Sequence, residues 1–188
     1  HFPDDPEWQT ETGDVLDADY LASLGKFDVV YAWGVLHHTG QMWRAMDNVT
    51  VPLRPGGKLF VSIYNDEGYR SRRWRKIKLF YNRAAPPFRW AILLWVLLKQ
   101  WGRTCISDLL HGRPFRSWRN YKSSRGMSAW HDVVDWAGGY PYEVAKPEEV
   151  FEFYRTRGLR LTRLKTDGGP GCNQFVFVRE ATFPSATQ

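Results

Sequence analysis

Two runs of β-branched and aromatic residues flank a segment with helical periodicity within residues 26–66. The first run is "KFDVVYAWGVL" and the second is "KLFVSIYND". Between them, apolar residues recur at helical spacing: Met42, Trp43, Met46, Val49 and Leu53. The two runs predict buried strands, the segment between them predicts a helix, and "RPGG" predicts the turn before the second strand. Strand, helix and strand in this order favour a βαβ unit with parallel strands, which places the chain in the α/β class.

Further helices and a hairpin are predicted on either side of this unit. "EWQTETGDVLD" predicts a short strand that ends in an acidic turn, and residues 19–24 predict a helix that stops at Gly25. In "KPEEVFEFYRTRG", a proline, two glutamates in the first turn and Gly158 as C-cap predict another helix. "LRLTRLKT" and "QFVFVRE", separated by "DGGPGCN", predict a terminal β-hairpin.

The positive charge of the chain is concentrated in its middle. The 188 residues have a formal net charge of +6, and residues 66–125 hold 15 Lys and Arg against 3 Asp and Glu. Prolines in this tryptophan-rich segment predict breaks between two or three helices. We therefore expect three regions: residues 1–65 as part of a core, residues 66–145 as a basic helical insertion, and residues 146–188 as the final helix and hairpin of the core.

The cysteine content and the hydropathy of the chain indicate in which cellular compartment we expect the protein. Cys105 and Cys172 lack the spacing of metal ligands, which indicates neither a disulfide scaffold nor a zinc site. The longest apolar run, residues 90–98, is about half as long as a bilayer span requires. We expect a protein of the reducing cytoplasm that could also bind peripherally at a membrane.

Four motifs in a fixed order point to a known family. "GDVLD", "FDVVYAWGVLHHTG", "LRPGGKLFVSIYN" and the closing hairpin together resemble the class I S-adenosylmethionine-dependent methyltransferases. Within that family, the "LHH" motif is similar to that of the quinone- and small-molecule methylases. The resemblance covers residues 8–65 and 146–180. It implies a partial Rossmann-like sheet, mostly parallel with an antiparallel C-terminal hairpin, and a helical insertion outside the common core.

The resemblance also implies S-adenosylmethionine as cofactor and assigns four residues to it. Asp14 would accept a hydrogen bond from the adenine amino group, and Val15 would contact the adenine ring. Trp33 and Gly34, at the end of the first buried strand, would line the methionine arm. Ligands of open α/β sheets bind at the carboxyl ends of the strands, where these last two residues are expected.

Two adjacent histidines follow the same strand. The resemblance places His37 and His38 between cofactor and substrate, where a neutral imidazole could accept a proton from the attacking hydroxyl or amine, or only position it. A second interpretation is that one ring simply hydrogen-bonds within the loop. A metal site is disfavoured because no further Cys, His or Asp cluster is spaced to complete it.

The glycine-rich turn and the acidic residue that hold the cofactor in this family have no counterpart in the sequence. In the family's strand order, the strand preceding that turn lies beside "DVVYAW", so we expect this segment to form an exposed apolar edge. We accordingly expect an N-terminally truncated form that is inactive alone. Its reaction would be methyl transfer to a small molecule, with a lipid- or quinone-like acceptor preferred.

The basic segment allows several interpretations. Residues 69–125 could be a solvated helical cap, a lid over an apolar substrate, or an interfacial helix on an anionic membrane. Nucleic-acid binding is less favoured because of the long apolar run. The alternative to an enzyme is therefore a non-catalytic module that binds a membrane or nucleic acid through this cap. His131 and Tyr140 could cover the active site or serve packing.

Overall fold

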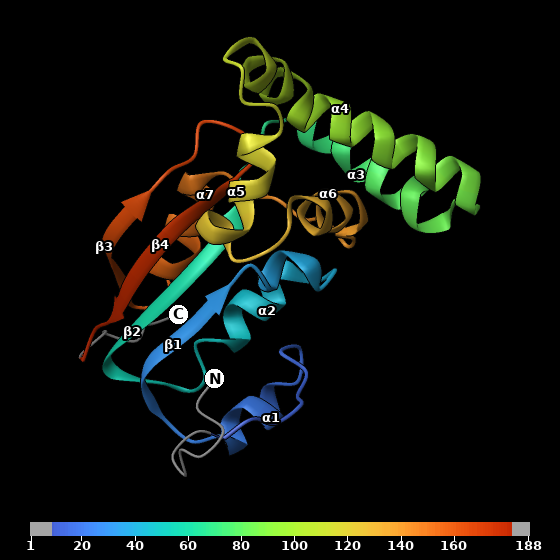
Figure 1. Ribbon diagram of the computed structural model, residues 1–188. Coiled ribbons are helices and arrows are strands. Elements are labelled where there is room, and N and C mark those ends of the chain that lie inside the picture. Colours follow the sequence, from blue (N-terminus) through green and yellow to red (C-terminus); the bar gives the residue numbers. More distant parts are fainter. Residues whose placement is uncertain (1–8, 182–188) are drawn as a thin grey trace. The chain divides into compact units, whose positions relative to one another are not determined.

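The structure, a computed structural model, describes residues 9–181 (Figure 1). The chain divides into two compact units. The sheet unit comprises the described residues up to Glu67 and from Glu143 onward, and the helical unit comprises residues 68–142.

The sheet unit contains a four-stranded mixed sheet with helices. Its elements in chain order are α1 (Ala18–Ser23), β1 (Phe27–Trp33), the 3-10 turn η1 (Leu36–His38), α2 (Met42–Asn48), β2 (Leu53–Tyr64), α7 (Pro147–Arg155), β3 (Leu159–Lys165) and β4 (Cys172–Arg179). The strand order is β1-β2-β4-β3, with β1 parallel to β2 and the other two pairs antiparallel. The predicted α/β class, the parallel βαβ unit and the terminal hairpin are confirmed, and the β1–β2 pair is the parallel part of the described sheet.

The helix of the βαβ unit buries most of its predicted apolar stripe. Met42 and Met46 are almost fully buried, and Leu53 at the start of β2 is completely buried. Trp43 is different: it is 40% exposed, and its ring lies 5.1 Å from that of Phe153 on α7. One position after Met42 is a turn of 100° around the helix, which moves Trp43 from the core to its border.

The predicted "RPGG" turn lies inside β2. The pairing of β2 with β1 is irregular between Phe27 and Val29, where residues 54–57 bulge out of β2. Gly56 has a φ of +76°, and a Cβ on Gly57 would lie only 2.9 Å from a backbone carbonyl oxygen of the same bulge. These two glycines therefore allow the tight bulge that brings β2 into register with β1.

The short strand predicted within residues 7–17 is wrong for the part that the structure describes. Residues 9–17 form a loop with a turn, and residues 7 and 8 lie outside the described residues. β1 forms the edge of the described sheet, so residues 9–17 have no strand of the described chain to pair with beyond it. The segment is held instead by a hydrogen bond from the Tyr20 hydroxyl to the Glu11 carboxylate, 2.9 Å long.

The sheet has one covered face and one open face. The covered face packs against α2 and α7 with fully buried side chains: Leu59, Val61, Ile63, Phe175 and Phe177. On the other face, Val29, Tyr31 and Trp33 of β1 are 55%, 65% and 39% exposed. The predicted exposed apolar edge at β1 is thus confirmed, and the apolar surface continues from this edge onto the open face.

The helical unit contains α3 (Tyr69–Arg83), α4 (Pro86–Leu110), α5 (Arg116–Arg125) and α6 (Ala129–Gly138). Three helices lie within residues 69–125, where the sequence predicts two or three, and α4 begins at Pro86. Tryptophan pairs join the helices, with ring centroids 4.8 to 5.9 Å apart: Trp74–Trp95, Trp74–Trp136, Trp90–Trp130 and Trp101–Trp118. No helix within residues 9–181, α4 included, combines the length and the apolar composition that crossing a membrane requires.

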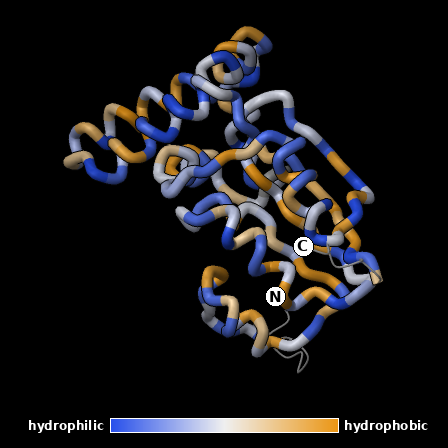
Figure 2. Tube along the Cα trace, turned by 180° about the vertical axis from the view of Figure 1, so that it is seen from behind, coloured by the Kyte–Doolittle hydropathy of each residue, from blue (hydrophilic) through white to orange (hydrophobic). Residues whose placement is uncertain are grey.

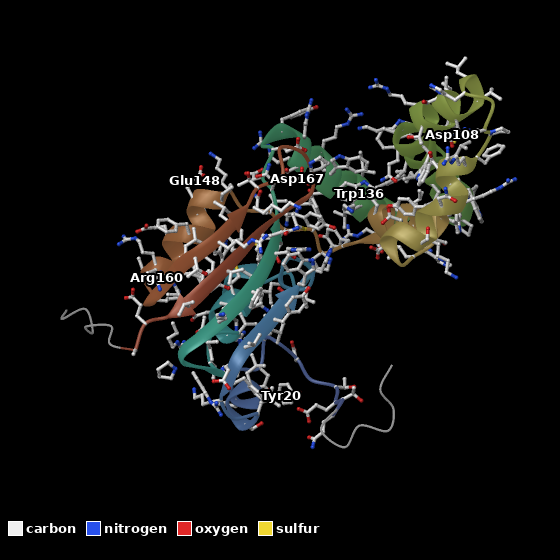
Figure 3. All side chains as sticks on the ribbon, turned by 60° about the vertical axis from the view of Figure 1, so that its left-hand side comes forward. Tyr20, Asp108, Trp136, Glu148, Arg160 and Asp167 are labelled. Carbon is white, nitrogen blue, oxygen red and sulfur yellow. The ribbon has the colours of Figure 1, made fainter. Side chains whose placement is uncertain are left out.

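A buried cation lies within this aromatic core. Lys78 of α3 is fully buried, and its Nζ donates a hydrogen bond to the carbonyl oxygen of Trp136, a residue of α6 labelled in Figure 3. The Nζ atom lies 4.2 Å from the centroid of the Trp136 ring and 5.1 Å from that of Tyr142. Burial lowers the pKa of the Lys78 amine to about 8, and the carboxylate of Asp135 opposes this shift. Holding the charged amine here therefore costs folding stability.

Candidate functional site

The candidate site begins where β1 and β2 end. Gly34 directly follows β1 with a φ of +75°, and its amide donates a 2.9 Å hydrogen bond to the Ser62 hydroxyl of β2. A Cβ placed on Gly34 would meet no atom within 4 Å, so the backbone is open here. Because the strands are parallel, their carboxyl ends meet at one edge of the sheet, the usual ligand position in open α/β folds.

The two histidines form a ring cluster with Tyr64 at the end of β2. The ring centroids of His37 and Tyr64 are 4.2 Å apart, those of His38 and Tyr64 are 5.6 Å apart, and the two imidazoles are 4.5 Å apart. The 3-10 turn η1 places them there because Leu36, its first residue, is fully buried in the core. His37 is only 1% exposed whereas His38 is half-buried, so His38 is the more accessible to a ligand.

A segment distant in sequence holds this cluster in place. The backbone amide of Glu143 donates a 3.0 Å hydrogen bond to the carbonyl oxygen of His37, and the amide of Ala145 donates one of 3.0 Å to that of Tyr64. The Glu143 carboxylate also accepts a 3.0 Å hydrogen bond from the amide of Met42, the first residue of α2. Glu143 therefore connects the histidine turn to the helix that follows it. Sequence reasoning missed this role because no local pattern pairs residues a hundred positions apart.

Replacing Glu143 by alanine is expected to lower the free energy of unfolding by about 1 kcal/mol, because the amide of Met42 loses its acceptor at the start of α2. Glu143→Gln is the matched control: it keeps an acceptor oxygen and should recover most of the loss. Urea-induced unfolding, followed by circular dichroism, measures both variants. Equal stability of the alanine variant and the wild type would contradict the role of this contact.

The predicted adenine-binding residues lie in a loop with its own hydrogen bonds. The Asp14 carboxylate accepts a 2.8 Å hydrogen bond from the amide of Leu16, and its carbonyl oxygen accepts one of 3.0 Å from Asp17. Val15 is half-buried against the core, and its carbonyl oxygen accepts a 3.0 Å hydrogen bond from the Asn48 side chain at the end of α2. The structure thus brings His37, His38 and Tyr64 together, and it fixes Asp14 and Val15 through a separate set of contacts.

Trp33 lies on the open face of the sheet, where its ring stacks on that of Tyr31 at 5.6 Å.

Near the same end of the sheet, burial raises the pKa of the Cys172 thiol to about 11, and a hydrogen bond with Ser62 opposes this shift. Both cysteines are free thiols. Among residues 9–181, no three His, Cys, Asp or Glu side chains are grouped so that they could hold a metal ion.

The glycine-rich loop between β3 and β4 closes the hairpin. The side chain of buried Asn173 donates a 3.0 Å hydrogen bond to that of Asn65 and accepts one of 3.0 Å from the amide of Asp167, which is labelled in Figure 3. The Asn65 amide group also donates to the carbonyl oxygen of Gly169 at 3.3 Å. This loop is therefore occupied in fixing the end of β2 beside Tyr64.

His131 and Tyr140 lie in the helical unit. The Nδ1 atom of His131 is 2.7 Å from the hydroxyl of Ser128, which caps the N-terminus of α6. Tyr140 follows α6 and is 36% exposed. His131 thus takes part in the helix cap, a local packing role of the kind considered from the sequence.

No family model matches the chain, and no curated protein matches its sequence. Its fold is similar to two structures of PKMT2 from Rickettsia typhi, one of them in complex with AdoHcy. Both have a TM-score of 0.53 and cover 89% of this chain and 38% of that one, with 15% and 14% identity. An O-methyltransferase family protein from Burkholderia thailandensis matches with a TM-score of 0.44 and 14% identity, over 90% of this chain and 35% of that one.

The chain thus spans 38% of the length of the PKMT2 structures. At this level of identity, the similarity shows a fold and nothing finer. That fold is a partial Rossmann-like methyltransferase fold.

Proposed function

We propose that this chain supplies the acceptor side of an S-adenosylmethionine-dependent methyltransferase whose substrate is a small molecule, preferably lipid- or quinone-like. The observation that carries the proposal is the cluster of His37, His38 and Tyr64 beside Gly34, at the carboxyl ends of parallel strands in a methyltransferase fold. One PKMT2 structure contains AdoHcy, the product that remains after S-adenosylmethionine gives up its methyl group, which supports this cofactor.

The residues present fit the cofactor in kind. Asp14 is exposed and ionisable, so it could accept from the adenine amino group while Val15 contacts the ring. The open backbone at Gly34 and the half-exposed ring of Trp33 suit the methionine arm. S-Adenosylmethionine, when bound, supplies an electrophilic methyl group.

The histidine cluster would act on the acceptor. A ring nitrogen of His38 would accept the proton that an acceptor hydroxyl or amine loses as it attacks the methyl group. His37 and Tyr64 would act as positioning residues, since their rings pack against the His38 ring and fix its orientation. The surrounding apolar side chains would exclude water from an apolar acceptor.

We further propose that the cofactor needs residues beyond those described here. The edge of β1 can accept another strand, and its Val29 and Tyr31 side chains would be covered by a second layer of helices, as α/β sheets usually are on both faces. We therefore expect the 188-residue chain alone to bind the cofactor weakly and to turn over no substrate.

Asp14→Asn is expected to lower the affinity for AdoHcy about tenfold, in a form of the protein that binds it. The substitution keeps an acceptor for the amide of Leu16 but removes the negative charge, and a charge-assisted hydrogen bond contributes roughly 1.5 kcal/mol. Titration calorimetry measures the change, with Asp19→Asn at the exposed start of α1 as the matched control. If a form with a completed sheet bound neither AdoHcy nor S-adenosylmethionine, the enzyme proposal would fail.

The second candidate function is a non-catalytic module that uses the basic helices to bind an anionic partner. Residues 66–125 hold 15 Lys and Arg against 3 Asp and Glu, which favours such a partner with or without catalysis. Binding of S-adenosylmethionine distinguishes the methyltransferase from the non-catalytic module, because the module needs no cofactor.

A further inference from the structure

The longest helix of the protein carries an apolar face that no other part of the helical unit covers. Leu93, Val96 and Trp101 of α4 are buried inside this unit. Around the opposite side, large apolar side chains recur at helical spacing and are 56% to 66% exposed: Phe88, Leu94, Leu98, Ile106 and Leu109. We call these five residues the apolar face of α4. Figure 2 shows hydrophobic stretches along the helices of this unit, with hydrophilic residues between them.

A groove extends the apolar face toward α3. It has a volume of about 480 Å³, and its apolar lining comes from Ile77 and Phe80 of α3 and from Ala91, Ile92 and Trp95 of α4. Arg73 and Lys76 of α3 complete the lining. The guanidinium of Arg73 lies 6.0 Å from the centroid of the Trp95 ring, and the Lys99 amine lies 5.2 Å from it. Cations therefore lie beside the apolar lining of the groove.

The charge of these helices is almost entirely positive. Residues 69–125 contain 15 Lys and Arg and a single acidic residue, Asp108, labelled in Figure 3. The Asp108 carboxylate accepts hydrogen bonds of 2.8 and 2.9 Å from the amide and hydroxyl of Ser117, so it is engaged in holding the start of α5. The surface around the apolar face therefore presents a strong positive field.

We propose that the apolar face of α4 and the adjoining basic groove dock onto a membrane surface rich in anionic phospholipids, with α4 lying in the plane of the interface. The apolar side chains would enter the boundary between headgroups and acyl chains, and the cations of α3 and α4 would contact lipid phosphates. Trp95, between cations and apolar side chains, has the amphipathic character of residues at membrane interfaces. The proposal is independent of methyl transfer.

Other occupants fit these observations less well. From Phe88 to Leu109 the face is roughly 30 Å long, which exceeds the size of a small-molecule acceptor. Nucleic acid would need exposed rings for base stacking, but four of the five residues of this face are aliphatic. A second copy of the chain would bring two strongly basic surfaces together, which like-charge repulsion disfavours.

Flotation of the whole 188-residue chain with phospholipid vesicles tests the proposal. Vesicles of phosphatidylcholine with roughly 30% phosphatidylglycerol, a composition in which anionic headgroups dominate the attraction, should bind it at least ten times more tightly than pure phosphatidylcholine. Binding should weaken steeply as the salt concentration rises, because exposed charges are screened within about 8 Å at physiological ionic strength.

Two variants separate the apolar contribution from the charged one. Leu98→Glu should lower vesicle affinity at least tenfold, whereas Leu164→Glu, the same exchange on an exposed residue of β3, should change it less than twofold. Combining Arg73→Gln with Lys76→Gln should lower it roughly 30-fold, since each cation near an anionic surface contributes about fivefold. Circular dichroism confirms that each variant is folded.

Three results would overturn the proposal. One is equal binding to neutral and anionic vesicles, and another is vesicle binding that Leu98→Glu leaves unchanged. The third is absence of vesicle binding. A salt-sensitive complex with a single-stranded oligonucleotide would then indicate nucleic acid as the occupant, and a dimer that Leu98→Glu dissociates would indicate a second copy of the chain. AdoHcy binding does not enter any of these results, so failure here and failure of the proposed methyl transfer remain distinguishable.

Discussion

Replacing His38 by alanine, in a form of the protein that turns over, is expected to lower kcat about a hundredfold and to change the affinity for AdoHcy less than threefold. A general base positioned at the reacting group typically contributes at least about a hundredfold to the rate. His38 is the half-buried member of the cluster, so its ring can face a ligand while Tyr64 fixes it edge-on at 5.6 Å. Steady-state kinetics and calorimetry together measure the two effects.

Two further variants test what His38 does. His38→Gln can hydrogen-bond to an acceptor but cannot take up its proton, so it should remain close to the alanine variant if the imidazole is the base. His37→Ala should behave differently, because the His37 ring is buried: we expect a loss of about 2 kcal/mol in the free energy of unfolding together with the loss of rate. Wild-type kcat in His38→Ala would remove this residue from the mechanism.

The second large effect concerns Lys78. Its pKa is lowered to about 8 in the folded protein from the ordinary value of 10.5, so the unfolded chain binds more protons between these two values. Where the unfolded state binds more protons, stability rises with pH. The helical unit should therefore gain about 2 kcal/mol from this group between pH 7 and pH 9.5, because the penalty of the buried charge is fully present below pH 8 and is relieved above it.

Lys78→Met isolates this contribution, since it keeps the length and apolar stem of the side chain and removes the amine. From pH 7 to pH 9.5, the unfolding free energy of the wild type should rise by about 2 kcal/mol relative to that of the variant. Denaturant unfolding, followed by tryptophan fluorescence of the helical unit, reports it. Lys99→Met, on the exposed side of α4, is the control and should show no such pH dependence. A wild-type-to-Lys78→Met difference that stays constant with pH would contradict the lowered pKa.

Much of the sheet unit could be predicted because its signals are local. The βαβ unit follows from hydrophobic periodicity, and the helix from Pro147 follows from its proline and glutamates. The failures have physical causes. The short strand predicted within residues 7–17 has no described neighbour, and a strand depends on its neighbour for hydrogen bonds. The exposure of Trp43 depends on where α7 packs, which periodicity does not contain.

The candidate site was predictable only where it is continuous in sequence. His37 and His38 stand out because they follow a strand, and the structure confirms that they lie at its carboxyl end. Tyr64 and Glu143 carry no such signal, since their roles depend on contacts across the fold. Lys78 is one of 15 cations in its segment, and the packing of α3 against α6 is what reveals that it is buried.

The way the chain enters and leaves the helical unit has an evolutionary consequence. The sheet unit is interrupted after Glu67 and resumes at Glu143, and a hydrogen bond holds these two segments side by side: the amide of Asp66 donates to the carbonyl oxygen of Ala145 at 3.2 Å. Insertions whose ends already meet can be exchanged with little cost to their host. The same segment, residues 143–145, also donates backbone hydrogen bonds to the carbonyl oxygens of His37 and Tyr64. All 75 residues of the helical unit, Gly68–Tyr142, could therefore be exchanged among related chains while the contacts around His37 and Tyr64 are kept.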